Sequence, residues 1–237
     1  MGGRFSRTDL LLGAEAVTRL SLSRVLIFGL GGVGGAAMEA VCRAGVGHID
    51  VVDPDVVSLT NFNRQIIALE STVGMKKTEA AKIRMKDINP EVNVKTYEVF
   101  VSEHTISEFD FTAYDYVLDA IDTVSAKLLI IEKCAEAGTP IISSMGTGNK
   151  LDPSLLRIGD IYETSMCPLA RIMRRELRKR GVLRLDVVWS PEEPKTPMVT
   201  ASEKKGNGRV PGSVSFLPPV AGYFMACSAV MKLSGVI

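Results

Sequence analysis

The stretch Arg-Val-Leu-Ile-Phe-Gly-Leu-Gly-Gly-Val-Gly, residues 24–34, gives the strongest indication of the fold of this chain. Four apolar residues lead directly into the glycines, which is typical of a buried strand that delivers a phosphate-binding turn. Gly29, Gly31 and Gly34 satisfy the pattern G-x-G-x-x-G, and Gly32 adds a fourth glycine. Such glycines permit a tight turn, close approach of the backbone to a phosphate and close packing of the next helix, whose first N–H groups then face an anion.

The residues after the glycines supply the context that this motif needs. The pattern predicts a helix over residues 36–44 and a second apolar strand over residues 49–52, which Asp53 closes. This carboxylate lies 19 residues beyond Gly34, close to where an acid binds the ribose of a nucleotide. A glycine-rich structural turn without a ligand agrees less well with this order of strand, helix, strand and acid. The stretch therefore predicts a mononucleotide or dinucleotide site.

Composition places the chain among ordinary globular proteins. Its 237 residues are 46% hydrophobic and 23% charged, a balance that allows a full core. No charged and then apolar signal sequence opens the chain, and its four cysteines are far apart without a C-x-x-C pair. These features predict a reducing cytoplasm, no disulfide framework and no structural zinc. The net charge of +1 excludes no class of partner by itself.

Strand and helix patterns alternate through the first two thirds of the chain. Helices are predicted over residues 8–20, 76–88, 102–109 and 127–137, and further strands over residues 92–101, 114–120 and 140–144. This alternation predicts an α/β fold with a doubly wound, mostly parallel, Rossmann-like sheet. The polar residues 54–65 are expected to form a structured connection over the carboxyl ends of the strands, where ligands bind in such sheets.

The C-terminal third breaks this alternation. It is predicted to form strands over residues 155–162 and 187–189, a helix over residues 167–180 and a mobile polar segment over residues 191–213. We therefore expect a single domain over residues 1–237, with a nucleotide-binding core at about residues 20–150 and a C-terminal α+β extension at about residues 151–237.

Residues 214–231 contain no charge, which raises the alternatives of a membrane span and a buried core helix. A bilayer requires about 20 predominantly apolar residues. Pro218 and Pro219 interrupt the stretch, and it is rich in Ala, Gly, Ser and Cys. These residues favour a core helix, and no membrane association is expected.

The residues around the glycine turn distinguish hydride transfer from the use of ATP. Asn61, Arg64 and Gln65 lie in the polar connection, Lys77 begins the next helix, and Asp122 follows the fourth strand. Adenylation needs positive charge on the pyrophosphate leaving group and a carboxylate for magnesium, whereas hydride transfer has no need of two cations and a second acid. The alternatives are that Arg64 and Lys77 are surface charges and that Asp122 caps a helix.

Several motifs resemble the ThiF-type, ubiquitin-activating-enzyme-like adenylyltransferase superfamily over residues 4–146. They are Gly-Leu-Gly-Gly-Val-Gly, Asp53-x-Asp55, Ser-Leu-Thr-Asn-Phe-Asn-Arg-Gln, Val-Gly-x-x-Lys and Leu-Asp-Ala-Ile-Asp. The resemblance implies a nucleotide site made by Gly29, Gly31, Gly32, Gly34, Asp53, Asp55, Asn61, Arg64, Gln65 and Lys77, with Asp53 on the ribose, Asn61, Arg64 and Lys77 on the phosphates, and Asp122 on Mg²⁺. Arg7 matches an arginine that in this superfamily reaches the nucleotide of the partner subunit, which implies a homodimer.

Two features indicate a branch of this superfamily. Members that activate sulfur-carrier proteins usually hold zinc with two C-x-x-C pairs, and this sequence has none. The stretch Ile-Ser-Ser-Met-Gly-Thr-Gly-Asn-Lys-Leu-Asp-Pro, residues 142–153, followed by Cys-Pro-Leu-Ala-Arg-Ile-Met-Arg, resembles the tRNA threonylcarbamoyladenosine dehydratases. This resemblance covers nearly the whole chain. It implies that ATP activates the carboxylate of a threonylcarbamoyl group on the adenosine beside the anticodon, and that an internal nucleophile then closes a ring with net loss of water.

Two other classes of function remain open. An adenylyltransferase for the C-terminus of a ubiquitin-like or sulfur-carrier protein is the first alternative, and a non-enzymatic, nucleotide-dependent tRNA-binding module is the second. The sequence leaves open a monovalent cation, a sulfur-transfer protein partner and a role for Cys167, which opens the predicted helix over residues 167–180. The expected ring closure needs no covalent intermediate on the enzyme, so an uninvolved thiol is favoured at this position.

The helix over residues 167–180 is strongly basic on one face. The spacing i, i+3, i+4, i+7 places four arginines together, Arg171, Arg174, Arg175 and Arg178, and the opposite face is expected to hold Met166, Leu169, Met173 and Leu177. Lys179, Arg180 and Arg184 extend the basic surface. Such a stripe is the electrostatic footprint of binding to a phosphate backbone, which predicts the tRNA-binding surface here. A merely solvated helix face is the alternative.

Overall fold

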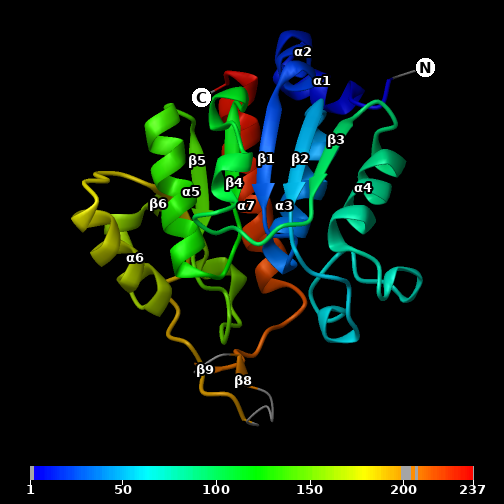
Figure 1. Ribbon diagram of the computed structural model, residues 1–237. Coiled ribbons are helices and arrows are strands. Elements are labelled where there is room, and N and C mark those ends of the chain that lie inside the picture. The colour runs from blue at the N-terminus through cyan, green and yellow to red at the C-terminus, as the bar shows by residue number, and fades with distance from the viewer. Residues whose placement is uncertain (1–2, 199–203, 206–207, 237) are drawn as a thin grey trace.

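The computed structural model describes residues 3–198, 204–205 and 208–236. A seven-stranded sheet lies at its centre, with helices on both faces (Figure 1). The strand order is β3-β2-β1-β4-β5-β7-β6, and only the pair β6–β7 is antiparallel. The strands are β1 (Arg24–Phe28), β2 (His48–Val52), β3 (Asn93–Tyr97), β4 (Tyr116–Asp119), β5 (Ile141–Ser144), β6 (Arg157–Asp160) and β7 (Asp186–Trp189). The predicted doubly wound, mostly parallel α/β sheet is therefore confirmed.

Most of the helices form one layer on each face of this sheet. The helices are α1 (Ser6–Leu12), α2 (Ala14–Leu22), α3 (Gly32–Ala44), α4 (Lys77–Ile88), α5 (Val124–Ala137), α6 (Pro168–Lys179) and α7 (Leu217–Ser234). One core cluster packs α3, α4 and α7 against the sheet, and two others lie under α5 and α6 on the opposite face. In Figure 1, α5 and α6 lie in front of the sheet, and α3 and α7 lie behind it. A two-stranded ribbon, β8 (Lys204–Lys205) with β9 (Gly208–Arg209), completes the elements.

The uncharged C-terminal stretch forms the core helix α7, which packs closely along α3. This close crossing requires glycine at position 222, because a Cβ atom there would lie 2.2 Å from the carbonyl oxygen of Val33. None of the described helices is long and apolar enough to cross a bilayer. The predicted mobile segment over residues 191–213 includes residues 199–203 and 206–207, which lie outside the described residues.

Two predicted helices were wrong. The helix expected over residues 8–20 is divided into α1 and α2 at Gly13, whose φ of +87° interrupts the helical backbone. The helix expected over residues 102–109 is reduced to a single 3-10 turn at Ile106–Glu108. There, the Thr105 hydroxyl accepts from the backbone N–H of Ser102 and donates to the carbonyl of Phe100. These side-chain bonds compete with the backbone bonds of a helix.

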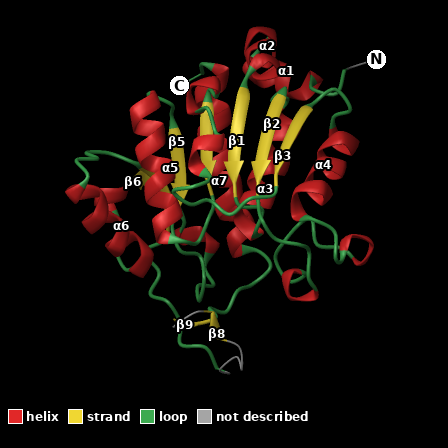
Figure 2. Cartoon of the chain, viewed as in Figure 1, coloured by secondary structure: helices red, strands yellow, loops and turns green. Residues whose placement is uncertain are grey.

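The sheet creates a binding position at the carboxyl ends of β1 and β4. These strands are neighbours, but the chain continues from β1 to β2 on one side and from β4 to β5 on the other. Ligands of doubly wound folds bind in the crevice outside such a switch point. Long loops extend beyond this edge of the sheet (Figure 2), and they carry predicted site residues that include Asp53, Arg64 and Asp122.

Candidate active site

The glycine turn between β1 and α3 lies at this switch point. Gly29 has φ +86°, and a Cβ atom there would lie 2.9 Å from the carbonyl oxygen of Ala120. A Cβ atom at Gly34 would lie only 1.8 Å from the oxygen of Gly29, so the turn requires glycine at both positions. Gly32 is packed against Pro218 of α7 and Arg64. Gly31, by contrast, faces open space at the start of α3, where a ligand phosphate can approach the backbone.

Lys77 and two aspartates form a connected group beside this turn. Lys77 begins α4, and only 5% of its surface is exposed. Its ammonium group donates to Asp55 at 2.7 Å and lies 3.4 Å from the carboxylate of Asp53. Asp53 also accepts hydrogen bonds from the backbone N–H groups of Leu30, at 2.7 Å, and Asp55, at 2.9 Å. The carboxylate thereby joins the end of β2 to the glycine turn.

The polar connection after β2 brings the remaining predicted nucleotide ligands to the same edge. Asn61 is buried, and its side-chain oxygen accepts from the N–H of Ser58. The guanidinium of Arg64 donates to the carbonyl of Thr60 at 3.0 Å, and its Cγ atom lies against Gly32 of the turn. Gln65 is buried as well, and its Oε1 atom has no hydrogen-bond partner in the described part of the chain. An orphaned buried acceptor of this kind is suited to a ligand donor.

Asp122 lies at the adjacent strand end. It is exposed in the loop between β4 and α5, and it accepts a long hydrogen bond of 3.4 Å from the hydroxyl of Thr123. A buried network of hydrogen bonds, which the sequence patterns did not reveal, lies next to this loop. The ammonium of Lys127 bonds Asp119 at 2.9 Å and Ser143 at 3.0 Å, and the Ser143 hydroxyl donates to Asp119 at 2.6 Å. All three residues are fully buried.

The buried ion pair ties the ends of two strands to a helix. Asp119 ends β4, Ser143 belongs to β5 and Lys127 lies in the first turn of α5. The second carboxylate oxygen of Asp119 accepts from the N–H of Ile121 at 3.2 Å. Loss of one partner of such a pair would leave an uncompensated buried charge, so we expect it to be important for the local fold.

Arg7 is the one predicted catalytic residue that lies away from this edge within the protomer. It is exposed on α1, which lies at the amino ends of the strands, opposite to the glycine turn (Figure 1). No residue of α1 is buried, and Leu10 and Leu11 are 87% and 84% exposed. The structure therefore does not bring Arg7 to the site of its own chain.

The basic face of α6 is present, but its arginines differ in their surroundings. Arg171, Arg175 and Arg178 are exposed, and a hollow of about 470 Å³ lies between them and their neighbours. Arg174 is partly buried, and its guanidinium donates to the carbonyl and the hydroxyl of Thr164. The predicted packing face was wrong at Met166, which is 64% exposed just before the helix.

The residues that pack α6 against the core are Cys167, Ala170, Met173 and Leu177. Cys167 is thus a buried thiol. In α3, burial raises the pKa of the Cys42 thiol to about 11, so that this cysteine is protonated at neutral pH. All four cysteines are free.

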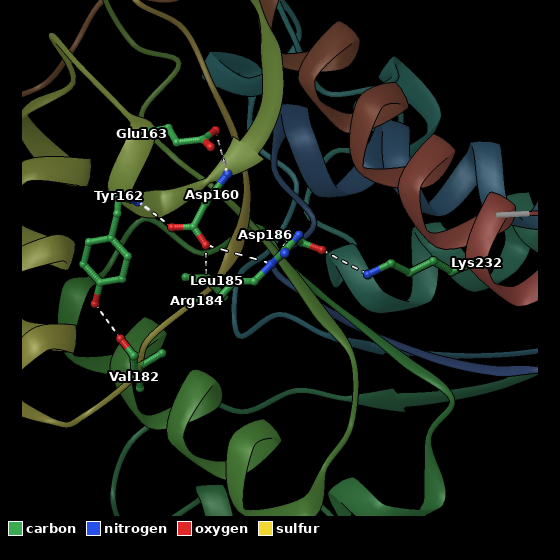
Figure 3. Close-up of polar contacts among 8 residues, drawn as sticks. All are labelled: Asp160, Tyr162, Glu163, Val182, Arg184, Leu185, Asp186 and Lys232. Atoms are coloured by element: carbon green, nitrogen blue, oxygen red, sulfur yellow. Dashed lines mark hydrogen bonds and ion pairs between the residues drawn. The ribbon is translucent and has the colours of Figure 1, made fainter.

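Figure 3 shows how the connection between α6 and β7 is held. Asp160 accepts from the backbone N–H groups of Tyr162, at 2.8 Å, and Leu185, at 3.3 Å. The Tyr162 hydroxyl donates to the carbonyl of Val182 at 2.5 Å, and the guanidinium of Arg178 lies over the Tyr162 ring at 5.1 Å from its centre. These contacts fasten the end of α6 to the sheet, so its basic face is presented on a rigid element.

Comparison with known proteins agrees with this geometry. A model of the ThiF family matches residues 5–236. The tRNA threonylcarbamoyladenosine dehydratase of Bacillus subtilis is 41% identical, over 97% of this chain and 94% of its own length. The crystal structure of E. coli tRNA N6-threonylcarbamoyladenosine dehydratase in complex with ATP is 31% identical, with a TM-score of 0.88 over 98% of this chain and 94% of that one.

Relatives with a different name match a smaller part of the chain. The adenylyltransferase and sulfurtransferase UBA4 of Vanderwaltozyma polyspora is 39% identical, but over 61% of this chain and 33% of its own length. The dehydratases of Bacillus subtilis and Haemophilus influenzae match over 94% and 93% of their own length. The chain therefore belongs to the ThiF family and, within it, to the tRNA threonylcarbamoyladenosine dehydratases.

Proposed function

We propose that this protein is an ATP-dependent tRNA threonylcarbamoyladenosine dehydratase. The observation that carries the proposal is the gathering of Arg64, Lys77, Asp53 and the orphaned acceptor of Gln65 around the glycine turn. This arrangement occurs in a chain that matches a named dehydratase over nearly its whole length. The group provides two cations for a phosphate chain and acceptors for the ribose, as an adenylating enzyme requires.

The proposed reaction has two steps. A carboxylate oxygen of the threonylcarbamoyl group attacks the α-phosphorus of ATP, and pyrophosphate leaves. An internal nucleophile of the same group then attacks the activated carbonyl carbon, and AMP leaves with the former carboxylate oxygen, which amounts to loss of water. In the first step, Arg64 and Lys77 stabilise the charge that develops on pyrophosphate. Lys77 can reach a phosphate by turning its ammonium away from the exposed carboxylate of Asp55.

Asp122 is the residue that fits a magnesium ion. The described residues contain no cluster of three or more His, Cys, Asp or Glu side chains that would form a preformed metal site. Mg²⁺ commonly binds one or two protein carboxylates together with substrate phosphates, so a single exposed carboxylate at the strand end is sufficient. The ion would neutralise charge on the phosphates during displacement of pyrophosphate.

We further propose a homodimer, in which Arg7 of one chain completes the site of the other. Arg7 lies far from its own site, on a helix that buries none of its residues. The exposed Leu10 and Leu11 beside it are suited to burial against a second copy. The tRNA substrate and the free cysteines support a cytoplasmic location. A sulfur-transfer protein partner also stays a prediction, which the resemblance to relatives named as adenylyltransferase and sulfurtransferase supports.

Analysis of tRNA nucleosides by mass spectrometry tests the proposed reaction. Incubation of protein, ATP and Mg²⁺ with tRNA that carries threonylcarbamoyladenosine should yield a nucleoside lighter by one water, with one AMP released for each nucleoside converted. The reaction should depend on ATP and on the modified tRNA. ATP–pyrophosphate exchange that requires a carrier-protein tail, with unchanged tRNA, would instead identify the adenylyltransferase alternative. Binding of tRNA without any consumption of ATP would identify the non-enzymatic module.

The basic face of α6 is the proposed tRNA surface. Replacing Arg171, Arg175 and Arg178 with alanine removes three exposed charges and leaves the apolar packing residues of α6 in place. It also removes the contact of Arg178 with the Tyr162 ring, so thermal unfolding must show that the variant is folded. Each lost phosphate contact lowers the slope of log affinity against log salt by roughly 0.7 to 0.9, so the triple variant should show a slope shallower by up to about 2 to 3. Filter binding at several salt concentrations measures this slope.

Arg174 serves as the comparison residue on the same helix. Because its guanidinium bonds Thr164, Arg174→Ala should lower thermal stability more than it changes the salt slope. If the triple variant keeps the wild-type affinity and slope, the face is only a solvated surface and the tRNA binds elsewhere.

A further inference from the structure

The chain returns to the edge of the candidate site shortly before α7, and Asn149 holds it there. Asn149, in the loop after β5, has a left-handed backbone with φ 60°. Its carbonyl accepts from the N–H of Lys195 at 2.6 Å, and its own N–H donates to the carbonyl of Gly212 at 2.9 Å. Its side-chain oxygen accepts from the N–H of Gly212 at 2.6 Å. Asn149 therefore holds both the segment that leaves the core, at Lys195, and the segment that returns to it, at Gly212.

The contact is close as well as polar. Gly148, the residue before this asparagine, packs closely against Pro211. A Cβ atom at position 148 would lie only 2.8 Å from the Cβ of that proline. After residue 213, the chain enters α7, whose Pro218 packs against Gly32 of the glycine turn. The returning chain is thus held against the site at its beginning and at its end.

Asn63 connects this returning chain to the phosphate-binding loop. Its side-chain nitrogen donates to the carbonyl of Ser213 at 3.0 Å, and its side-chain oxygen accepts from the guanidinium of Arg64 at 2.8 Å. The same guanidinium nitrogen also donates to the carbonyl of Thr60. An arginine side chain has many rotamers, and holding it in one of them costs conformational entropy. Asn63 restricts the rotamers of Arg64 only while its own side-chain amide is fixed, and the hydrogen bond to the carbonyl of Ser213 fixes it.

We propose that Asn63 and Asn149 are positioning residues, which use the returning chain at residues 211–213 to orient the guanidinium of Arg64 toward the phosphates of ATP. The inference rests on the proposed role of Arg64. Neither asparagine contacts the nucleotide in this scheme. Asn149 fixes the main chain of residue 212, the adjacent carbonyl of Ser213 orients the amide of Asn63, and the amide orients Arg64.

Two variants interrupt the chain of hydrogen bonds from Asn149 to Arg64, each at a different residue. Asn63→Ala removes the amide beside Arg64. Asn149→Gly removes only the side-chain acceptor, because glycine adopts a positive φ without strain and retains both backbone hydrogen bonds. We expect each variant to lower kcat/KM for ATP by about tenfold, since a misoriented charge stabilises the transition state less well. The loss should be smaller than for Arg64→Ala, because Thr60 still accepts from the guanidinium.

Three comparisons separate positioning from a general structural role. Asn149→Asp keeps an oxygen acceptor for Gly212 and should restore kcat/KM for ATP to within about twofold of wild type. The double variant Asn63→Ala/Asn149→Gly should be no worse than the poorer single variant, because both act through one connection. The dissociation constant for tRNA should remain within about twofold of wild type. Asn93→Ala, at an exposed asparagine that begins β3, is the control for surface substitution.

The outcomes distinguish this inference from the proposed function. Wild-type kcat/KM in both single variants, together with a strongly impaired Arg64→Ala protein, would contradict the positioning role and leave the active site intact. Additive losses in the double variant, or lower thermal stability with unchanged kcat/KM, would also contradict it. An unimpaired Arg64→Ala protein would overturn the proposed role of Arg64 itself.

Discussion

Replacing Lys77 with alanine is expected to lower AMP formation by about a hundredfold or more, because loss of a charged contact to a developing anion commonly has an effect of 10² to 10³ in rate. Lys77 is the buried cation closest to Asp53 at the candidate site. Release of AMP from ATP in the presence of modified tRNA measures the effect. Arg64→Ala should give a loss of similar size, since Arg64 is proposed to bind the same phosphate chain.

The neighbouring lysine supplies a matched control for this experiment. Lys76 is exposed and pairs with Glu98 at 3.5 Å, so Lys76→Ala should retain nearly full activity. Removal of Lys77 also leaves the carboxylates of Asp53 and Asp55 without their cation. Thermal unfolding must therefore show that the variant is folded before its activity is interpreted. A folded Lys77→Ala protein with wild-type turnover would remove Lys77 from the site.

Mixing two inactive variants should restore activity if Arg7 acts across a dimer. Arg7→Ala and Asp122→Ala proteins are each expected to be inactive, since every site of either homodimer lacks one residue. In a heterodimer of the two, one site carries both substitutions and the other carries neither. Random exchange of subunits makes half of the dimers heterodimers, so about a quarter of wild-type activity should return in a symmetric two-site dimer.

The control is a protein that carries both substitutions in one chain. Mixed with the Arg7→Ala protein, it should restore nothing, because no site then contains both residues. Light scattering under the assay conditions provides a second measurement. A monomer by light scattering, or mixtures that stay inactive although subunits exchange, would rule out the shared site.

The glycine turn and the strands beside it were predictable because their signals are local. A strand that is buried on both faces needs an uninterrupted apolar run, as in residues 25–28, and a tight turn needs glycine where any Cβ atom would clash. The helix expected over residues 102–109 was wrong for an equally local reason. The hydroxyl of Thr105 offered the backbone other hydrogen bonds than those of a helix, and a hydrophobic pattern does not register that competition.

The buried network around Lys127 could not be predicted from the sequence pattern. Lys127 lies on the buried face of α5, together with Ile130, Ile131 and Cys134. A lysine on such a face indicates that a group of opposite charge pairs with it. Its partner Asp119 lies on β4, only eight residues earlier. The third member, Ser143, becomes a neighbour only because β5 pairs with β4 in register. The spacing could have identified the lysine, but not the network.

The α/β class, the strand that delivers the phosphate-binding turn and the residue types typical of an adenylating site could be predicted from sequence, because each is carried by short motifs or by local periodicity along the chain. The residues that support that site could be identified only from the fold. Asn63 bonds Ser213 across 150 residues of sequence, and Arg7 is separated from its own nucleotide turn by the length of the sheet. Such contacts depend on strand order and helix packing, and residue spacing along the chain carries no information about either.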